Sequence, residues 1–202
     1  MGKSKKFSDR EKTRADIIQK SAILFNKKGY LSTSIGDIEK CTGFSRGSIY
    51  GNFDSKEEVA LEAFRYNFRQ MFSGIKAMVD IATTAKDKLL AYPRYHRQHH
   101  PYYINRGGCV VLNTSIDADD TNPALSAKAV QYIGVWEKSI NYILDLGETQ
   151  DEWKAPINRK AFFARFVGLI QGGIFLTKTT GDDEYLLSNL ALLEEYIEDM
   201  SK

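Results

Sequence analysis

The chain has 202 residues, of which 43% are hydrophobic and 27% charged, a balance typical of a globular protein with its own core. No apolar run reaches the roughly 18 residues that a membrane span needs, and the basic start of the sequence leads into no apolar signal segment. Cys41 and Cys109 are too few for a disulfide framework and have no metal-ligand spacing. We therefore expect a reduced, cytoplasmic protein with no cofactor and no membrane partner.

Positive charge is concentrated at the start of the sequence. Residues 1–57 contain 12 Lys and Arg against seven Asp and Glu, whereas the remainder contains 16 against 19. A basic segment on a mildly acidic body favours a polyanionic partner for that segment. Chance clustering gives the same pattern, so the charge needs a matching geometry before it indicates a function.

Four helices are predicted in the first 80 residues from the spacing of apolar side chains and from capping residues. The first runs from about residue 8 to a terminating glycine, Gly29. The second begins at residue 33 or 34 and stops at Gly43, and the third runs from Ser45 to about Asn52. A long fourth helix, capped by Ser55, extends to about residue 80. The first three form a compact three-helix unit.

The remainder of the chain also lacks strand-like alternation, so the predicted fold class is all-α, with about nine helices. A fifth helix starts near Thr84 and is expected to kink or end at Pro93. A loop is expected between Pro101 and Gly107, and the apolar residues 109–116 are too few to classify by period. Three further helices are predicted at about 123–146, 158–179 and 183–200.

The most informative stretch is residues 33–53, which has the pattern of a helix, a glycine turn and a second helix. Gly43 supplies a corner with positive φ, Phe44 fills the space between the helices, and Ser45 caps the second helix. The outward face of that helix carries groups that suit phosphate oxygens and base edges, namely Arg46, Ser48, Tyr50 and Asn52. This pattern predicts a helix-turn-helix that binds duplex DNA.

Glycine, capping, aromatic and lysine residues occur in this region at a specific spacing. Thr-Ser-Ile-x-Asp-Ile spans 33–38, Gly-Phe-Ser-x-Gly-Ser-Ile-Tyr spans 43–50, and Asn-Phe and Ser-Lys-Glu follow within 52–57. The pattern resembles the DNA-binding end of the tetracycline-repressor (TetR) family of bacterial regulators over roughly the first 65 residues. The resemblance implies a helix-turn-helix domain at 1–55 and a helical ligand-binding and dimerisation domain at 56–202.

The same resemblance implies contacts with a double-stranded DNA operator. The implied phosphate contacts are Thr33, Ser34, Tyr50, Asn52 and Lys56, and the residues implied to approach the bases are Ser45, Arg46, Gly47 and Ser48. Taken singly, Tyr50 could be a core aromatic and Lys56 a solvated charge, and only the joint pattern favours DNA. One departure is Glu39, where the family commonly has alanine. Its carboxylate must turn outward or pair, and the candidate partners are Lys40 and a residue of the first helix.

The segment 162–176 is apolar on nearly all sides, so it needs cover on two faces. Paired with the last helix, it would make a four-helix interface across a two-fold axis, or it could be the buried central helix of a monomer. A palindromic operator needs two reading heads, which favours a homodimer. The predicted interface residues are Phe163, Phe166, Val167, Ile170, Leu186, Leu190 and Leu193.

The resemblance also implies a pocket for a small-molecule effector whose identity the sequence does not give. Aromatic residues with hydroxyl groups could line it, although an aromatic stripe at helical spacing is more often core. The candidates are Phe68, Met71, Phe72, Tyr95, Tyr132 and Trp136.

The three histidines, His96, His99 and His100, lie close together in the sequence. In a helix, His96 and His100 are one turn apart, as two ligands of one metal would be. Arg94 and Arg97 oppose a cation, so a solvated helix end is favoured over a metal site or an enzyme.

Taken together, these observations predict a ligand-responsive DNA-binding repressor that is not an enzyme. A constitutive DNA-binding protein without an effector is the main alternative.

Overall fold

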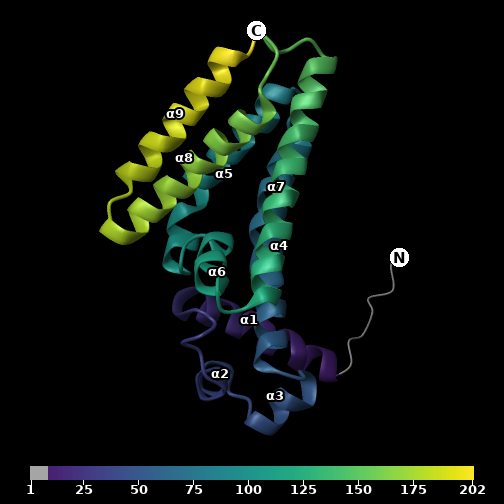
Figure 1. Cartoon of the computed structure of the whole chain (residues 1–202), viewed down its shortest axis with the longest axis vertical. Helices are drawn as coiled ribbons and strands as arrows, with labels where there is room; N and C mark the ends of the chain where they lie inside the picture. The colour runs from purple at the N-terminus through teal and green to yellow at the C-terminus, as the bar shows by residue number, and fades with distance from the viewer. Residues whose placement is uncertain (1–8) are drawn as a thin grey trace.

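In the computed structural model, which describes residues 9–202, the chain forms nine α-helices and one isolated β-bridge between Trp153 and Ser201. The predicted all-α class is confirmed. The prediction about a signal segment concerned the basic start of the sequence, and those residues lie outside the described range. Figure 1 shows a small group of helices at the lower end and longer helices above it.

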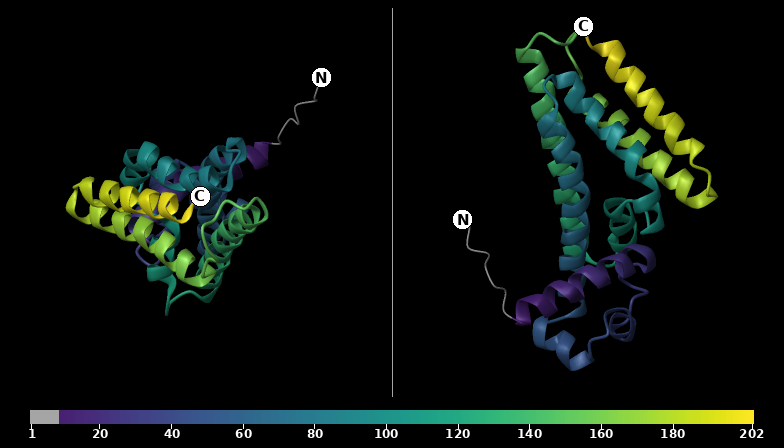
Figure 2. Two further views of the ribbon diagram at one scale, coloured as in Figure 1. Left: turned by 90° about the horizontal axis from the view of Figure 1, so that it is seen from above. Right: turned by 180° about the vertical axis from the view of Figure 1, so that it is seen from behind.

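The lower group consists of α1 (Asp9–Lys28), α2 (Ile35–Thr42) and α3 (Arg46–Asn52). Helix α1 lies across the base of the molecule, with α2 and α3 beneath it (Figures 1 and 2). Their inner faces meet the start of the next helix in a small cluster of fully buried side chains: Ile17, Ile38, Ile49, Phe53 and Val59. Within residues 9–202, this arrangement leaves the lower faces of α2 and α3 uncovered by other helices.

The upper part is built on two long helices that stand side by side, α4 (Lys56–Ile81) and α7 (Pro123–Thr149). Helix α5 (Ala85–Asn105) packs against α4, α7 and α9 (Glu184–Met200). Helix α8 (Arg159–Thr180) pairs closely with α9, and the short α6 (Val110–Ala118) joins α7 near the base. One continuous apolar core connects these helices. Figure 2 shows the α8–α9 pair inclined away from α4 and α7.

Helix α5 does not end at Pro93, as the sequence had suggested, but continues through Pro93 and Pro101 to Asn105. A proline inside a helix removes a backbone donor and crowds the preceding turn. Here the helix is buried on its inner face at Leu89, Tyr92, Pro93 and His96, so packing offsets that cost. The expected loop at 101–107 shrinks to residues 106–109. The apolar residues 109–116, which could not be classified from the sequence, lie largely in α6 (Val110–Ala118).

Five of the seven residues predicted at a dimer interface are buried within the single chain. Phe166, Ile170, Leu186, Leu190 and Leu193 are at most 4% exposed, and they fill the space between α8, α9 and the rest of the core. Phe163 and Val167 are partly buried and pack against the same core. The prediction is wrong for the five buried residues, because other helices of the same chain already cover their side chains, as where Tyr92 of α5 meets Phe166 and Gly173 of α8 meets Leu186.

Candidate DNA interface

The geometry of α2 and α3 is set by capping interactions at each end. Ser34 caps α2 reciprocally with Asp37: the Ser34 hydroxyl accepts from the Asp37 amide, and the Asp37 carboxylate accepts from the Ser34 amide. Gly43 ends α2 with a φ of 80°, and Ser45 caps α3 by accepting from the Ser48 amide at 3.2 Å. The predicted helix, glycine corner and capped second helix are therefore confirmed.

Two arginines of α1 hold the far end of α3. The Arg10 guanidinium donates to the carbonyl of Gly51 at 3.0 Å, and the Arg14 guanidinium donates to the carbonyl of Asn52. Arg14 also lies 4.1 Å from the centre of the Phe53 ring. These bonds satisfy the last carbonyls of a helix that is only seven residues long, so α1 fixes the orientation of α3.

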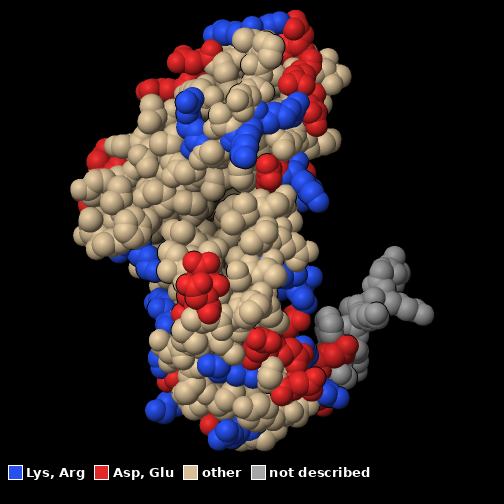
Figure 3. Space-filling view, in the orientation of Figure 1, with Lys and Arg blue, Asp and Glu red and all other residues tan. Residues whose placement is uncertain are grey.

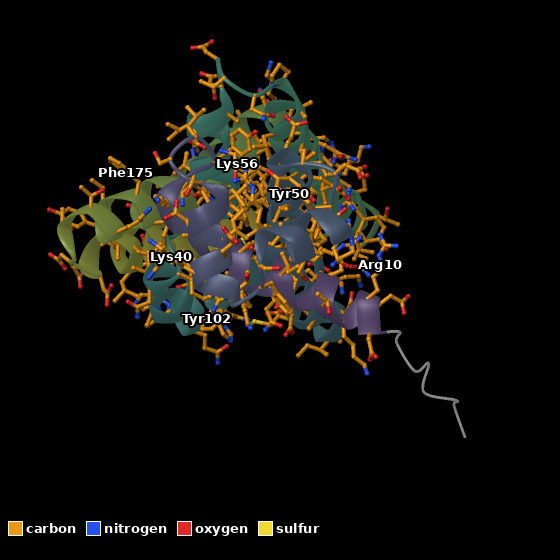
Figure 4. All side chains as sticks on the ribbon, turned by 90° about the horizontal axis from the view of Figure 1, so that it is seen from below. Arg10, Lys40, Tyr50, Lys56, Tyr102 and Phe175 are labelled. Atoms are coloured by element: carbon orange, nitrogen blue, oxygen red, sulfur yellow. The ribbon has the colours of Figure 1, made fainter. Side chains whose placement is uncertain are left out.

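The outer face of α3 presents polar side chains to solvent. Ser45, Arg46 and Gly47 are exposed, Tyr50 is 42% exposed, and the Arg46 guanidinium lies 5.8 Å from the centre of the Tyr50 ring. Figure 4 views the molecule from this end and shows Tyr50 facing outward. The alternative that Tyr50 is a core aromatic is thus excluded, and the arginine and the tyrosine form one exposed unit.

Two predicted residues lie further back on α3. Ser48 is half-buried, and its carbonyl accepts a hydrogen bond of 2.9 Å from the Asn52 side-chain amide. The Asn52 side-chain oxygen is buried and has no partner among residues 9–202. Asn52 is therefore turned partly against the helix.

Two predicted phosphate contacts have other roles in this structure. Thr33 is 1% exposed and its hydroxyl donates to the Gly29 carbonyl at 2.6 Å, so the prediction of a phosphate contact by its side chain is wrong. The Lys56 ammonium donates to the carbonyls of Tyr30 at 2.9 Å and Thr33 at 2.8 Å. It also lies 4.2 Å from the centre of the Tyr30 ring. Both side chains hold the turn between α1 and α2.

Glu39 caps the start of α3 instead of pairing with Lys40 or α1. Its carboxylate accepts from the Arg46 backbone amide at 2.7 Å, next to the Ser45 cap. The carboxylate therefore stabilises α3 but places a negative charge beside the face that carries Arg46. Lys40, which the sequence reading did not include among the DNA contacts, is exposed on this end of the molecule (Figure 4).

A polar joint connects α1 with the upper part of the molecule. The Asn26 side-chain amide donates to the carbonyls of Arg106 and Gly108, at 2.9 and 3.1 Å. The Asn113 side-chain amide donates to the Asn26 carbonyl at 3.1 Å. Gly107, with a φ of 110°, approaches so closely that a Cβ would lie 2.8 Å from Asn26. This joint ties the 106–108 turn to the end of α1.

Comparison with known proteins places these features in a family. Residues 17–63 match the family described as bacterial regulatory proteins, tetR family. Residues 85–192, more than half of the chain, match the tetracyclin repressor-like C-terminal domain. The chain belongs to the TetR family. It is therefore a transcriptional regulator with a helix-turn-helix DNA-binding domain, as its sequence predicted.

Relatives of this TetR-family protein include solved structures that cover almost the whole chain. A TetR-family transcriptional regulator from Cytophaga hutchinsonii is 34% identical with a TM-score of 0.90, and the match covers 98% of both chains. An uncharacterized HTH-type regulator of Lactococcus lactis is 28% identical over 92% of this chain and 93% of its own length. The repressor KstR2 of Mycolicibacterium smegmatis is 32% identical, but over only 38% of this chain and 37% of its own length.

The TetR-family chain also contains a cleft above the polar joint, with a volume of about 300 Å³. It lies between α4, α5, the end of α1 and the start of α6. Of the six predicted pocket residues, Met71 and Tyr95 line it. Trp136 lines a smaller adjoining space of about 20 Å³, together with Met71.

The other three predicted pocket residues, Phe68, Phe72 and Tyr132, stack on one another between α4 and α7. The ring centres of Phe68 and Tyr132 are 3.7 Å apart. They line neither of these two spaces, so sequence reasoning could not separate stacked core aromatics from cleft aromatics.

The histidines do not form a solvated helix end in this TetR-family fold. His96 and His100 are buried, and only His99 is exposed. Nδ1 of His96 lies 3.2 Å from the Tyr103 hydroxyl, and Nε2 of His100 lies 3.3 Å from the Asp183 carboxylate. Burial lowers the pKa of His96 to about 4. Within residues 9–202, no group of three His, Cys, Asp or Glu side chains is arranged to hold a metal ion.

Within the described part of the chain, α8 is the one helix long and apolar enough to cross a membrane. It packs against α9 and α5 and contributes six buried residues to the fold, as expected of a core helix. Its remaining apolar surface faces outward.

Proposed function

We propose that this TetR-family regulator is a repressor that binds a palindromic DNA operator as a homodimer in the cytoplasm and responds to a small-molecule effector. The observation that carries the proposal is the exposed polar face of α3, which α1 holds in a fixed orientation through Arg10 and Arg14. In this proposal, residues 1–55 bind DNA and residues 56–202 regulate and dimerise.

The proposed DNA contacts follow from exposure. Arg46 lies on the outer face and can form two hydrogen bonds with a guanine edge. Tyr50, Ser45 and Lys40 are exposed beside it and reach phosphates or bases, whereas Gly47 allows close approach. Ser34, Ser45 and Asn52 are proposed contacts whose side chains already form an internal hydrogen bond that they must share or exchange, and the half-buried Ser48 is a proposed contact as well. Lys56 would affect DNA binding indirectly, by holding the turn between α1 and α2 in place.

The proposed dimer face is the outward side of α8 and α9. Large apolar side chains are exposed there: Phe175 (55%), Leu176 (37%), Tyr185 (44%) and Leu192 (53%). Figure 3 shows a region over the lower half of these helices with few charged side chains. Exposed apolar patches of this kind mark protein interfaces, and a two-fold pairing of the same face would close the assembly.

Salt dependence of binding tests the DNA contacts. The purified protein should select a palindromic sequence from random duplexes, with half-sites one helical turn apart. About four phosphate contacts per head and two heads predict a slope near −7 for log K against log salt. A protein that binds no duplex at low salt, or binds with a shallow slope, would contradict the proposal.

Charge insertion tests the dimer face. Leu192→Asp places a carboxylate in the proposed interface, and we expect sedimentation to show a monomer that binds the operator much more weakly. Tyr142→Asp is the matched control, because Tyr142 is 68% exposed on α7, away from that face. A Leu192→Asp protein that stays dimeric would refute this surface.

The effector part of the proposal requires a molecule whose affinity differs between the DNA-bound and free states. The cleft of about 300 Å³ and the polar joint below it support it. A constitutive regulator differs in one measurable respect: no small molecule that binds the folded protein would change its affinity for the operator.

A further inference from the structure

We propose that the cleft binds a planar organic anion, a carboxylate on one or two aromatic rings, with the carboxylate beside Arg106. The inference rests on the proposed function in treating this cleft as the effector site. Binding to the cleft can nevertheless be measured without DNA, so the two ideas can fail separately.

The lining of the cleft suits flat rings. Its volume, about 300 Å³, is at the small end of the range for ligand pockets. Tyr95 and His99, both lining residues, stack with ring centres 4.4 Å apart and an interplanar angle of 22°. Met71 and Ile174 add apolar surface. Aromatic side chains of this kind prefer to stack on or meet the edges of another ring.

The charge of the cleft favours an anion. Among the described residues that line it, none is Asp or Glu, and Arg106 is the one Lys or Arg. Burial raises the pKa of the Tyr103 hydroxyl and of the Cys109 thiol, so both are neutral at pH 7. His96, with its lowered pKa, is neutral as well. Arg106 is therefore the one Lys or Arg among the described lining residues, while Asp183 and Lys178 lie close enough to act on Tyr103 and Cys109 from behind the lining.

Arg106 has no carboxylate partner of its own. None of the ion pairs formed within residues 9–202 includes it, and its guanidinium lies 5.0 Å from the centre of the Tyr102 ring. A ligand ammonium group would be repelled by this charge and would find the Tyr102 face already used by a cation. A ligand carboxylate would instead gain charge-assisted hydrogen bonds from the guanidinium.

The same residue connects the cleft with α1. The Arg106 carbonyl accepts the hydrogen bond from Asn26, and Asn26 itself lines the cleft. An anion held by the Arg106 side chain therefore bears on the turn that fixes α1, and α1 fixes α3 through Arg10 and Arg14. This gives the anion a physical route to the DNA-binding face.

The test uses matched ligands and calorimetric titration of the full chain without DNA. The probes are benzoate, naphthalene-2-carboxylate, naphthalene-2-carboxamide and trimethyl(2-naphthyl)ammonium. We expect one of the carboxylates to bind, the naphthyl carboxylate at least about tenfold more tightly than its amide, and the ammonium compound not to bind.

Three variants test whether Arg106 and the cleft are responsible for ligand binding. Arg106→Gln should remove the tenfold preference for carboxylate over amide. Arg94→Gln, an exposed arginine on α5 outside the cleft, should leave that preference unchanged. Gln70→Trp places a large side chain at an exposed position of the cleft wall and should abolish binding of every probe, with the fold checked by circular dichroism.

Three results would overturn the assignment: tighter binding of the ammonium compound, equal binding of carboxylate and amide, or no binding of either carboxylate at about 1 mM by folded protein. A protein that binds the carboxylate but no DNA would overturn the proposed function instead and leave the ligand class standing.

Discussion

The helix-turn-helix end and the upper helical part of this protein are held together in different ways. Helices α2 and α3 have eight and seven residues, too few to be stable alone, and five buried side chains form their core. Caps and two arginines of α1 complete the unit. The upper helical part has helices of up to 27 residues around one large core. A DNA-binding surface built on so few groups can be lost locally while the rest stays folded.

Core truncations in the two regions test this difference most strongly. Ile49→Ala and Leu190→Ala each remove most of a fully buried side chain, which costs about 2–5 kcal/mol in typical cores. We expect Ile49→Ala to speed hydrogen exchange in α2 and α3 and to abolish DNA binding, with little change in the main urea transition. Leu190→Ala should shift that main transition. If both variants shift it equally, the two regions unfold as one unit.

The buried His96 predicts that the stability of the upper helical part depends on pH. The unfolded chain protonates His96 near pH 6.5, whereas the folded protein does so only near pH 4. Between these values the unfolded state binds more protons, so the free energy of unfolding falls as the pH drops. We expect a loss of roughly 2 kcal/mol between about pH 7.5 and pH 4.5.

Urea titrations of histidine variants at the two pH values check this expectation. His96→Asn should lose most of the decrease, while His99→Gln, which alters the exposed histidine of the same helix, should retain it. An unchanged pH dependence in His96→Asn would assign the effect to other groups.

At the DNA-binding end, a surface substitution should change specificity without changing stability. Arg46 is exposed and packs loosely on Tyr50, so Arg46→Ala should leave the urea transition unchanged. We expect it to reduce discrimination at one base position of each half-site by about 1–3 kcal/mol, measured by competition between operator variants. Equal weakening on every sequence would identify Arg46 as a phosphate contact.

The smallest predicted effect concerns Glu39, where stability and DNA binding oppose each other. Glu39→Gln keeps an acceptor for the Arg46 amide but removes the negative charge beside the DNA face. We expect tighter non-specific DNA binding, by a few fold, at a cost in stability of about 1 kcal/mol or less. Filter binding to random duplex measures the first effect. Weaker DNA binding would mean that the cap matters more than the charge.

The helix-turn-helix geometry could be predicted closely because it is local. Gly43, Ser45 and Ser34 act on neighbours within four residues, so their roles follow from sequence spacing. Residues whose partners are distant in sequence could not be placed. Thr33 was expected at a phosphate but is buried, and the Lys56 ammonium is bound by carbonyls of the turn between α1 and α2. The partner of Glu39, the Arg46 backbone amide, comes within reach only because of the corner between α2 and α3.

The sequence by itself determined the all-α class, the helix boundaries near caps and glycines, and the helix-turn-helix with its family. These depend on interactions within one or two helical turns. The tertiary structure alone decided that α5 continues through Pro93, that Leu190 faces inward while Leu192 faces outward, and that Phe68 stacks in the core whereas Tyr95 lines the cleft. Helical periodicity identifies an apolar face, but only the packing of distant helices determines what covers it.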